Sequence, residues 1–157
     1  MIKKIVIVTG SRAEYGLLYK LIKKLDKDKS IDLKIIVTGM HLSKKYGNTY
    51  KEIIKDGFKI HKKINILSSS NSNFSISQSV GNGILSFASF YQKEKPELII
   101  VLGDRYELLS AVIPANFQQI PIFHIEAGNR CFDQEKPDRK VSQHLPGLKL
   151  PHYTCFR

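Results

Sequence analysis

The sequence of 157 residues has few cysteines and no long apolar run, and both absences exclude classes of protein. Its apolar stretches reach only the length of a strand, well short of the ~20 residues that a membrane-spanning helix needs. Cys131 and Cys155 lack metal-ligand spacing, and two thiols do not make the framework of a disulfide-rich secreted domain. The opening stretch from Met1 to Val8 has no small-residue cleavage site and leads into a turn. We interpret it as a strand rather than a signal peptide, and we expect a cytoplasmic protein with no membrane partner.

Acidic residues are also fewer than basic ones, and the excess of basic residues is uneven along the chain. Residues 1–63 hold 16 lysines and arginines against 6 acids, a net charge of +10, whereas residues 64–157 hold 9 against 8, a net of +1. Lysine supplies 20 of the 25 basic residues, and the lysines at 20, 23, 24, 27 and 29 fall on the outer face of an expected helix. Nucleic-acid grooves more often combine arginine and aromatic residues with lysine, so we do not expect nucleic acid as a partner. We expect a solvated helix face that can also steer an anionic ligand.

Apolar periodicity predicts strands and helices that alternate along the first 128 residues. Strands are expected at 3–9, 33–38, 58–64, 98–102 and 120–125, and helices at 14–25, 48–56, 75–93 and 105–118. This order predicts an α/β fold with a Rossmann-like, doubly wound parallel sheet in one domain over residues 1–128. Residues 129–157 show no clear periodicity and are predicted to form an irregular tail.

The first of three unusual strand ends leads from Thr9 into the first helix. Gly10 and Ser11 stand where a helix N-terminus offers free N–H groups and a positive dipole end to a phosphate. Arg12 adds a bidentate donor for a phosphate or a carboxylate. In the alternative interpretation the turn is structural: Ser11 caps the helix and Arg12 pairs with Glu14. From the turn alone, the anion site and the cap are equally good interpretations.

The second strand end carries Gly103, Asp104 and Arg105 after a buried strand. In an open α/β sheet this turn lies at the carboxyl end of the strand, where ligands bind. Asp104 can act as an acid, a base or a ligand for a sugar hydroxyl, or it can be the N-cap of the next helix. Tyr106 and Glu107 are interpreted as residues that serve helix packing and solvation.

The third strand end carries His124 and Glu126. Residues two apart in a strand point to the same side of the sheet, so we expect these two side chains to lie together. A lone histidine near an apolar strand is more often a core residue, but the added glutamate favours a site. If the last two strands are neighbours, Asp104 and Glu126 form a pair of like charges. Repulsion or burial can raise a carboxyl pKa towards neutrality, where the group can transfer protons.

Together the three strand ends resemble one family, the UDP-N-acetylglucosamine 2-epimerases, and especially their hydrolysing branch of sialic-acid precursor synthesis. The stretch Val8–Leu18 resembles the opening of the family, and Leu102–Glu107 resembles the hydrolysing branch. The stretch Ile120–Gly128 resembles the family's His-Ile-Glu-Gly-Gly segment. All three occur in the family's order, which makes the combination more specific than any one motif.

The resemblance implies a two-domain fold of the glycosyltransferase-B type, of which this chain would supply the N-terminal half. It implies anti elimination of UDP from UDP-N-acetylglucosamine through a glycal, and then addition of water to release N-acetylmannosamine and UDP, with no metal, NAD or other cofactor. By matching position, Arg12 would hold the UDP end, Asp104 and Glu126 would transfer protons, and His124 would be the catalytic histidine of the same strand end. The other expected substrate-binding residues are Gly10, Ser11, Glu14 and Arg105.

The resemblance weakens after Gly128. Ala127–Asn129 stands where hydrolysing members have Gly-Gly-Glu, and Asn129–Gln134 is closer to the non-hydrolysing branch, which interconverts the UDP-sugar with its manno epimer. No counterpart of the family's second Rossmann-like domain is present, so we expect low or no activity unless a C-terminal half or a second subunit completes the site. Three other functions stay open: a non-hydrolysing epimerase, the acceptor domain of a glycosyltransferase, and a non-catalytic module that binds an anion or a partner.

Overall fold

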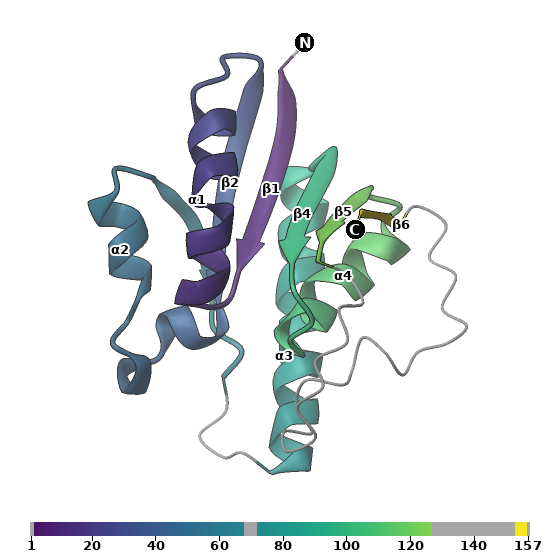
Figure 1. Ribbon diagram of the computed structural model, residues 1–157. Coiled ribbons are helices and arrows are strands. Elements are labelled where there is room, and N and C mark those ends of the chain that lie inside the picture. Colours follow the sequence, from purple (N-terminus) through teal and green to yellow (C-terminus); the bar gives the residue numbers. More distant parts are fainter. Residues whose placement is uncertain (1, 68–71, 127–152, 157) are drawn as a thin grey trace.

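A computed structural model describes residues 2–67, 72–126 and 153–156. They form one parallel sheet in the order β3-β2-β1-β4-β5-β6 (Figure 1). The strands are β1 Lys3–Thr9, β2 Ile31–Thr38, β3 Ile60–Ile64, β4 Leu98–Leu102, β5 Ile122–Ile125 and β6 Tyr153–Phe156. The chain order runs outwards from β1 on one side and from β4 on the other, so the topological switch point lies between these two strands. The predicted doubly wound parallel sheet is confirmed.

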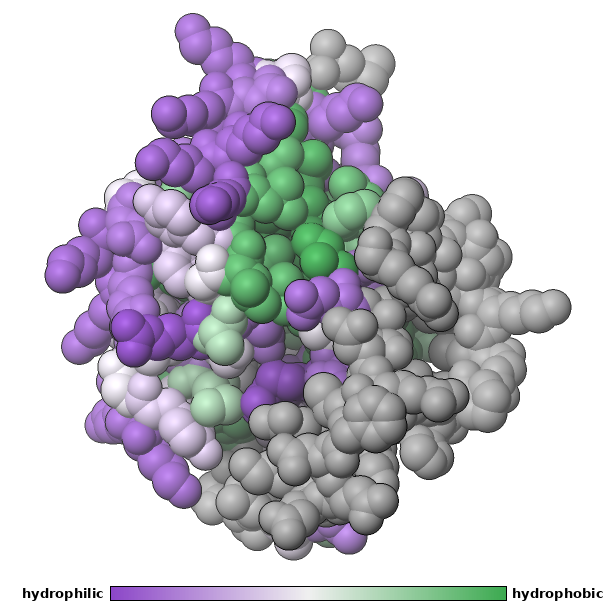
Figure 2. Space-filling view, in the orientation of Figure 1, coloured by the Kyte–Doolittle hydropathy of each residue, from purple (hydrophilic) through white to green (hydrophobic). Residues whose placement is uncertain are grey.

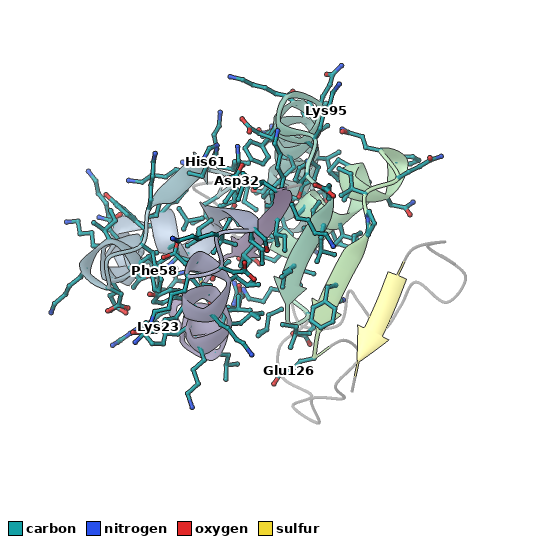
Figure 3. The ribbon with its side chains drawn as sticks, turned by 90° about the horizontal axis from the view of Figure 1, so that it is seen from above. Lys23, Asp32, Phe58, His61, Lys95 and Glu126 are labelled. Atoms are coloured by element: carbon teal, nitrogen blue, oxygen red, sulfur yellow. The ribbon has the colours of Figure 1, made fainter. Side chains whose placement is uncertain are left out.

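Helices lie on both faces of the sheet. The described helices are α1 Arg12–Asp26, α2 Tyr50–Lys55, α3 Asn73–Glu94 and α4 Glu107–Phe117, with the short 3₁₀ helices η1 Gly39–Leu42 and η2 Lys44–Tyr46. The α3 and α4 helices pack side by side behind the sheet in the view of Figure 1, and α1 lies in front of it. From above, Lys95 at the end of α3 and Lys23 of α1 lie on opposite sides of the sheet (Figure 3).

Each face of the sheet has its own apolar core. On one face Val8 packs in a cluster with Phe87 of α3 and Ala111 of α4. On the other face Ile7 belongs to a cluster that contains Leu18 of α1. Burial on both faces explains why the strands are near-continuous apolar runs. Figure 2 shows hydrophobic residues over β1 and β4 and hydrophilic residues along the outer side of α1. All five predicted lysines are exposed, but only those at 20, 23 and 24 belong to the helix, because α1 ends at Asp26 before Lys27 and Lys29.

The contact between α3 and α4 depends on a glycine. A Cβ atom on Gly83 would lie only 2.5 Å from Oγ of Ser110, so no larger residue fits there without a shift. The Ser110 hydroxyl donates to the Val80 carbonyl at 3.3 Å, and the Gln118 side chain donates to the Ala88 carbonyl at 2.9 Å. Glycine lowers helix propensity, but at position 83 it lets α3 and α4 approach closely, and this explains why a glycine stands inside the helix.

Three local expectations differ from the structure. The α4 helix begins at Glu107 rather than at 105, because Gly103 has a φ of +88° and opens a turn before the helix. The helix predicted at 48–56 is shorter, Tyr50–Lys55, and of its two isoleucines, both of which the apolar pattern places inward, only Ile53 is buried and Ile54 is exposed. The β6 strand lies in the segment predicted to be irregular; four residues are too few to show a periodic pattern, and β6 joins the sheet beside β5. Other residues of that segment, 129–152 and 157, lie outside the described residues.

Candidate functional site

The three strand ends selected from the sequence lie at one edge of the sheet. The β1 strand pairs with β4, and β4 pairs with β5, so their carboxyl ends are adjacent. The turns after β1 and β4 flank the topological switch point, outside which ligands bind in doubly wound sheets. The predicted adjacency of the fourth and fifth strands is confirmed. The candidate site is therefore the carboxyl edge of β1, β4 and β5.

The turn after β1 is closed by hydrogen bonds within the chain. Ser11 is the N-cap of α1, and its hydroxyl oxygen accepts the N–H of Glu14 at 3.4 Å. The Glu14 carboxylate folds back and accepts the N–H of Gly10 at 2.7 Å, in an arrangement similar to a capping box. Burial raises the pKa of Glu14, and the hydrogen bond from Gly10 opposes that rise. The cap interpretation of Ser11 is confirmed, and the amide of Gly10 already binds an internal carboxylate.

Arg12 is the exposed member of this turn. Its side chain is 74% exposed, and its Nε lies 3.0 Å from Oε2 of Glu52 in α2. The predicted pair with Glu14 is wrong, because Glu14 is directed inward to Gly10. Ion pairs between exposed side chains contribute little stability in water. A bound anion can therefore replace Glu52 at small cost.

Arg105 has the opposite environment. Its Nε and Nη2 donate to the Glu107 carboxylate at 3.1 and 2.8 Å, and its Nε lies 3.9 Å from Oε1 of Glu14. The Arg105 side chain is 33% exposed, whereas that of Glu107 is 2% exposed. Burial acts to lower the pKa of Arg105, but the hydrogen bonds and charge of Glu107 outweigh it and raise that pKa, so the guanidinium stays charged. Arg105 thus connects the turn after β4 to the turn after β1.

Glu107 is buried at the site, although its place in the sequence predicts a role in helix packing and solvation. Its carboxylate lies against Gly39, at the end of β2. A Cβ on Gly39 would lie 3.0 Å from Oε1 of Glu107 and 3.2 Å from the carbonyl oxygen of Gly10, and the φ of Gly39 is +54°. Glycine therefore leaves the space that the buried carboxylate occupies. The available signal was a glutamate two positions after an arginine in a strand-end turn.

Asp104 lies partly exposed in the turn between β4 and α4. The N–H of Gly103 donates to the carbonyl of Ile125 at 3.0 Å, which joins this turn to the end of β5. The N-cap residue of α4 is Tyr106, with no side-chain capping hydrogen bond. The capping alternative for Asp104 is therefore wrong, and a role in chemistry stays open for it.

His124 and Glu126 do not lie together as expected. His124 is buried, and its Nε2 donates to the Gly103 carbonyl at 2.5 Å; burial lowers its pKa, against the opposing effects of this hydrogen bond and the charge of Asp104. Glu126 follows the last residue of β5 with a φ of +57°, and this left-handed turn moves its side chain out of the strand pattern. Figure 3 shows Glu126 at the end of β5, directed away from the sheet. The two residues therefore occupy different environments at one strand end.

A fourth strand end supports the site and was missed from the sequence. His41, in η1 after β2, is fully buried; its Nδ1 lies 2.8 Å from Oγ1 of Thr49 and its Nε2 lies 3.1 Å from Oγ1 of Thr9. Burial lowers the pKa of His41 to about 4, although a hydrogen bond with the Ser11 backbone opposes the shift. The His41 N–H also donates to the Gly10 carbonyl at 3.0 Å. A neutral histidine therefore fixes the turn after β1 through hydrogen bonds. The only sequence signal for this role was a histidine two residues after Gly39.

The arrangement separates groups that face outward from groups that support them. Arg12 and Glu126 are exposed and Asp104 is partly exposed, at the ends of three adjacent strands. One cation and two carboxylates there can bind an anion and transfer protons. Within the described ranges, no group of three or more His, Cys, Asp or Glu residues could hold a metal ion. No described helix combines the length and apolar character needed to cross a membrane.

Comparisons with known proteins give the chain a context. A family model described as UDP-N-acetylglucosamine 2-epimerase matches residues 23–143. The hydrolysing UDP-N,N'-diacetylbacillosamine 2-epimerase of Legionella pneumophila is 42% identical over 153 residues, which cover 98% of this chain and 39% of that protein. The polysialic acid biosynthesis protein P7 of Escherichia coli is 41% identical over 82% of this chain and 33% of its own length. The chain thus spans about two fifths or less of the length of these relatives.

A solved structure extends the similarity to three dimensions. The UDP-GlcNAc 2-epimerase of Neisseria meningitidis, in a crystal structure bound to UDP-GlcNAc, superposes with a TM-score of 0.73 and 25% identity. The superposition covers 89% of this chain and 37% of that one. The described sheet therefore corresponds to one part of a larger molecule in that structure.

Proposed function

The chain belongs to the UDP-N-acetylglucosamine 2-epimerase family, and we propose that the carboxyl edge of its sheet forms one wall of the nucleotide-sugar cleft of a hydrolysing 2-epimerase. The observation that carries this proposal is the position of Arg12, Asp104 and Glu126 at the ends of three adjacent strands around the switch point. The Neisseria structure holds UDP-GlcNAc, which supports a nucleotide sugar as the substrate class. The name of the Legionella relative supports the hydrolysing outcome.

The proposed substrate is UDP-N-acetylglucosamine, with the bacillosamine analogue named for the Legionella relative as the second candidate. Both have a UDP leaving group and an N-acetylated sugar, so the same cleft chemistry serves either. The chain spans 39% of that relative, and we assign the opposite wall of the cleft to further polypeptide or to a second subunit. The cytoplasmic location expected from the sequence is part of this proposal.

In the proposed reaction a carboxylate removes the proton from C2 of the sugar. The bond from C1 to the UDP oxygen breaks, and the electron pair of the C2–H bond forms the double bond of a glycal. Water then adds its hydroxyl group to C1 and gives its remaining proton to a carboxylate, while a carboxyl group delivers a proton to the opposite face of C2, so that the products are N-acetylmannosamine and UDP. Asp104 and Glu126 are the proposed proton carriers. Arg12 is the proposed ligand of the diphosphate, because a guanidinium donates two parallel hydrogen bonds to phosphate oxygens.

Other residues of the predicted site receive supporting roles in this proposal. The Nε2 of His124 carries the proton that it donates to the Gly103 carbonyl, so His124 fixes the turn that contains Asp104. Gly10, Ser11 and Glu14 form the internal cap of α1. We assign Arg105 to the same support, since two of its nitrogen atoms already donate to Glu107. Substrate contact in the described turns then falls mainly to Arg12, Asp104 and Glu126.

The test is turnover in D₂O. The 157-residue chain is incubated with each UDP-sugar, alone and together with the remaining C-terminal portion of the Legionella relative, and free sugar and UDP are measured by NMR and mass spectrometry. Elimination followed by addition places deuterium at C2 of the released sugar. We expect slow turnover by the chain alone and faster turnover in the complemented mixture. Asp104→Asn and Glu126→Gln should each lower the rate by about 100-fold.

Controls and product identity separate the competing functions. Asp26→Asn, at the exposed far end of α1, should leave turnover unchanged. A UDP-linked manno epimer as the product would show the non-hydrolysing reaction, and sugar transferred to an acceptor would show a glycosyltransferase. Released sugar without deuterium at C2 would rule out the elimination mechanism.

A further inference from the structure

A pocket of about 320 Å³ lies at the edge of the sheet opposite the candidate site. Its wall comes from the last turn of α3, the two residues after that helix, and the loop between α4 and β5. These segments precede β4 and β5, whereas the candidate site follows the same strands. In Figure 1 the start of β4 is at the top, and the arrowheads of β1 and β4 point down towards the candidate site. The proposed function gives this pocket no role.

Main-chain hydrogen bonds hold the wall of the pocket in place. The N–H of Lys95 donates to the Tyr91 carbonyl at 2.8 Å, and the N–H of Ile99 in β4 donates to the Pro121 carbonyl at 2.9 Å. Lys95 and Gln119 have φ values of +50° and +56°, in the left-handed region that residues other than glycine rarely adopt. Surrounding contacts must fix such a backbone. The pocket is therefore a preformed part of the fold.

The wall contains a buried hydroxyl group that lacks a partner. Tyr91 is fully buried, and its ring contacts those of Phe87 and Phe90. Among the described residues its hydroxyl group has no hydrogen-bond partner. Buried polar groups are nearly always paired, and an unpaired one lowers stability. Burial also raises the pKa of Tyr91, so the hydroxyl keeps its proton and can donate it to an acceptor atom of a ligand.

The charge of the wall favours an anion. Lys95 is the one charged residue among the described residues that line the pocket, and its side chain forms no ion pair within the described ranges. The acidic residues nearest to it in the sequence have other contacts. Glu94 pairs with Lys34, and Glu97 accepts the N–H of Lys4 at 3.2 Å. The ammonium group at the rim is therefore available to a carboxylate or a phosphate.

Amide and apolar groups complete the wall. Gln92 and Gln119 are exposed, and their side-chain amides make no hydrogen bond in the described part of the chain. An amide both donates and accepts hydrogen bonds, as a sugar hydroxyl does. Pro96, Ile120 and Pro121 add a carbon surface that suits the C–H face of a sugar ring. The volume is at the lower end of the range for small-molecule pockets, which favours a single ring.

We propose that this pocket binds a single hexose that carries a carboxylate or a phosphate group. The anionic group pairs with Lys95 at the rim, the sugar hydroxyls bond to Gln92 and Gln119, and one sugar oxygen accepts the Tyr91 hydroxyl proton. Carboxylate and phosphate offer the same oxygen acceptors to an ammonium group, so the experiment compares them. Because the pocket and the candidate site lie at opposite edges of the sheet, each can be occupied without the other.

The experiment is an NMR titration of the 157-residue chain with three probes: glucuronate, glucose 6-phosphate and glucose. The probes share a ring and differ in the charged group. We expect a dissociation constant of about 0.1–1 mM for at least one of the two anions, and a constant at least about tenfold higher for glucose. The amide signals that shift should come from the last turn of α3, from Lys95 and from the loop at residues 118–120.

Variants separate the two polar contacts. Tyr91→Phe removes the hydroxyl and keeps the ring, so the dissociation constant of the tighter anion should rise about tenfold, while the urea midpoint should not fall because the lost hydroxyl has no described partner. Lys95→Met should raise the constants of the anions about tenfold and leave that of glucose unchanged. Lys93→Met is the matched control, because it removes an exposed lysine of the same turn that does not line the pocket.

The candidate site provides a further control. Arg12→Gln should leave the dissociation constants of all three probes unchanged, because Arg12 lies at the opposite edge of the sheet. The proposal is overturned if neither anion binds below about 10 mM, if glucose binds as well as the anions, or if Tyr91→Phe and Lys95→Met both bind like the natural chain. It is also overturned if Arg12→Gln weakens binding and Lys95→Met does not, since the probe then occupies the candidate site. Circular dichroism confirms that each variant is folded.

Discussion

Arg12 and Arg105 follow similar sequence patterns but have opposite environments in the structure. Each follows a glycine at the end of a central strand, in the turn that leads to a helix. Arg12 is 74% exposed and pairs with a partly exposed carboxylate on α2. Arg105 is 33% exposed and is bound by a buried carboxylate, with a second one 3.9 Å away. The first arginine can exchange its partner for a ligand, whereas the second joins two turns of the protein itself.

The difference follows from how well water solvates the carboxylate partner of each arginine. Glu52 reaches Arg12 from the surface, and water still solvates both groups, so the pair adds little stability. Glu107 and Glu14 are buried, and removal of their cation would leave two carboxylates without compensation in a region that water reaches poorly. A guanidinium at a strand end is therefore not by itself a ligand site. The burial of its carboxylate partner determines whether it is available to a ligand.

The largest expected effect is on stability, from the loss of Arg105. Arg105→Met should lower the free energy of unfolding by about 3–4 kcal/mol, because it strands the Glu107 carboxylate in the interior. Arg12→Met should lower it by less than about 0.5 kcal/mol. Urea denaturation of both variants measures the contrast. Equal losses would show that the two ion pairs do not differ as the burial indicates.

A second variant separates charge from packing at the same place. In Arg105→Met with Glu107→Met, both charged partners become apolar residues of similar length, and much of the lost stability should return. If the double variant is as unstable as Arg105→Met alone, the loss comes from packing and not from the stranded carboxylate.

His41 affects how the stability of the protein depends on pH. Burial lowers the pKa of His41 from 6.5, its ordinary value and the one expected in the unfolded chain, to about 4 in the folded protein. Between pH 4 and 6.5 the unfolded chain therefore binds a proton at His41 that the folded chain does not. Stability therefore rises with pH through this window and is lost as pH falls, by at most about 3 kcal/mol for this group. Burial lowers the pKa of His124, which acts in the same direction, and raises that of Glu14, which acts in the opposite one.

The pH effect is isolated by difference. His41→Gln should be less stable than the natural chain near neutral pH, and the gap between them should narrow as pH falls towards about 4. Urea denaturation across this range measures both curves. A gap that is independent of pH would mean that His41 titrates normally in the folded protein.

The two arginines also show what the sequence can and cannot predict. The strands are predictable because burial on both faces leaves apolar runs, and the strand-end turns follow from their positions between strand and helix. The partner of Arg12 is not predictable, because Glu52 lies on α2. The space for the Glu107 carboxylate is not predictable either, because it depends on Gly39 at another strand end, and no local pattern carries these distant contacts. The left-handed turn at Glu126 is not predictable for a different reason: glutamate rarely adopts this conformation, so the residue type does not indicate it.

Gly39 tests whether the buried carboxylate needs the space that glycine leaves. Gly39→Ala adds a Cβ 3.0 Å from Glu107 Oε1 at a φ of +54°, so we expect a loss of about 2–3 kcal/mol, with strain and crowding both contributing. Gly47→Ala is the matched control, since its φ is +81° but a Cβ there meets nothing within 4 Å. It should cost about 1–2 kcal/mol from backbone strain alone. Equal losses for the two would show that Glu107 moves aside without cost.

The smallest effect is expected at Glu52, and it concerns binding rather than stability. If the Glu52 carboxylate competes with an anion for Arg12, Glu52→Gln should strengthen the binding of UDP about threefold at low salt, and added salt should remove the gain. Arg12→Gln should weaken UDP binding about tenfold, because a charged hydrogen bond to phosphate is lost. In the combined variant Glu52→Gln should bring no gain, since it can act only through Arg12. Titration calorimetry measures all four proteins, and a gain that persists without Arg12 would show that Glu52 repels the ligand directly.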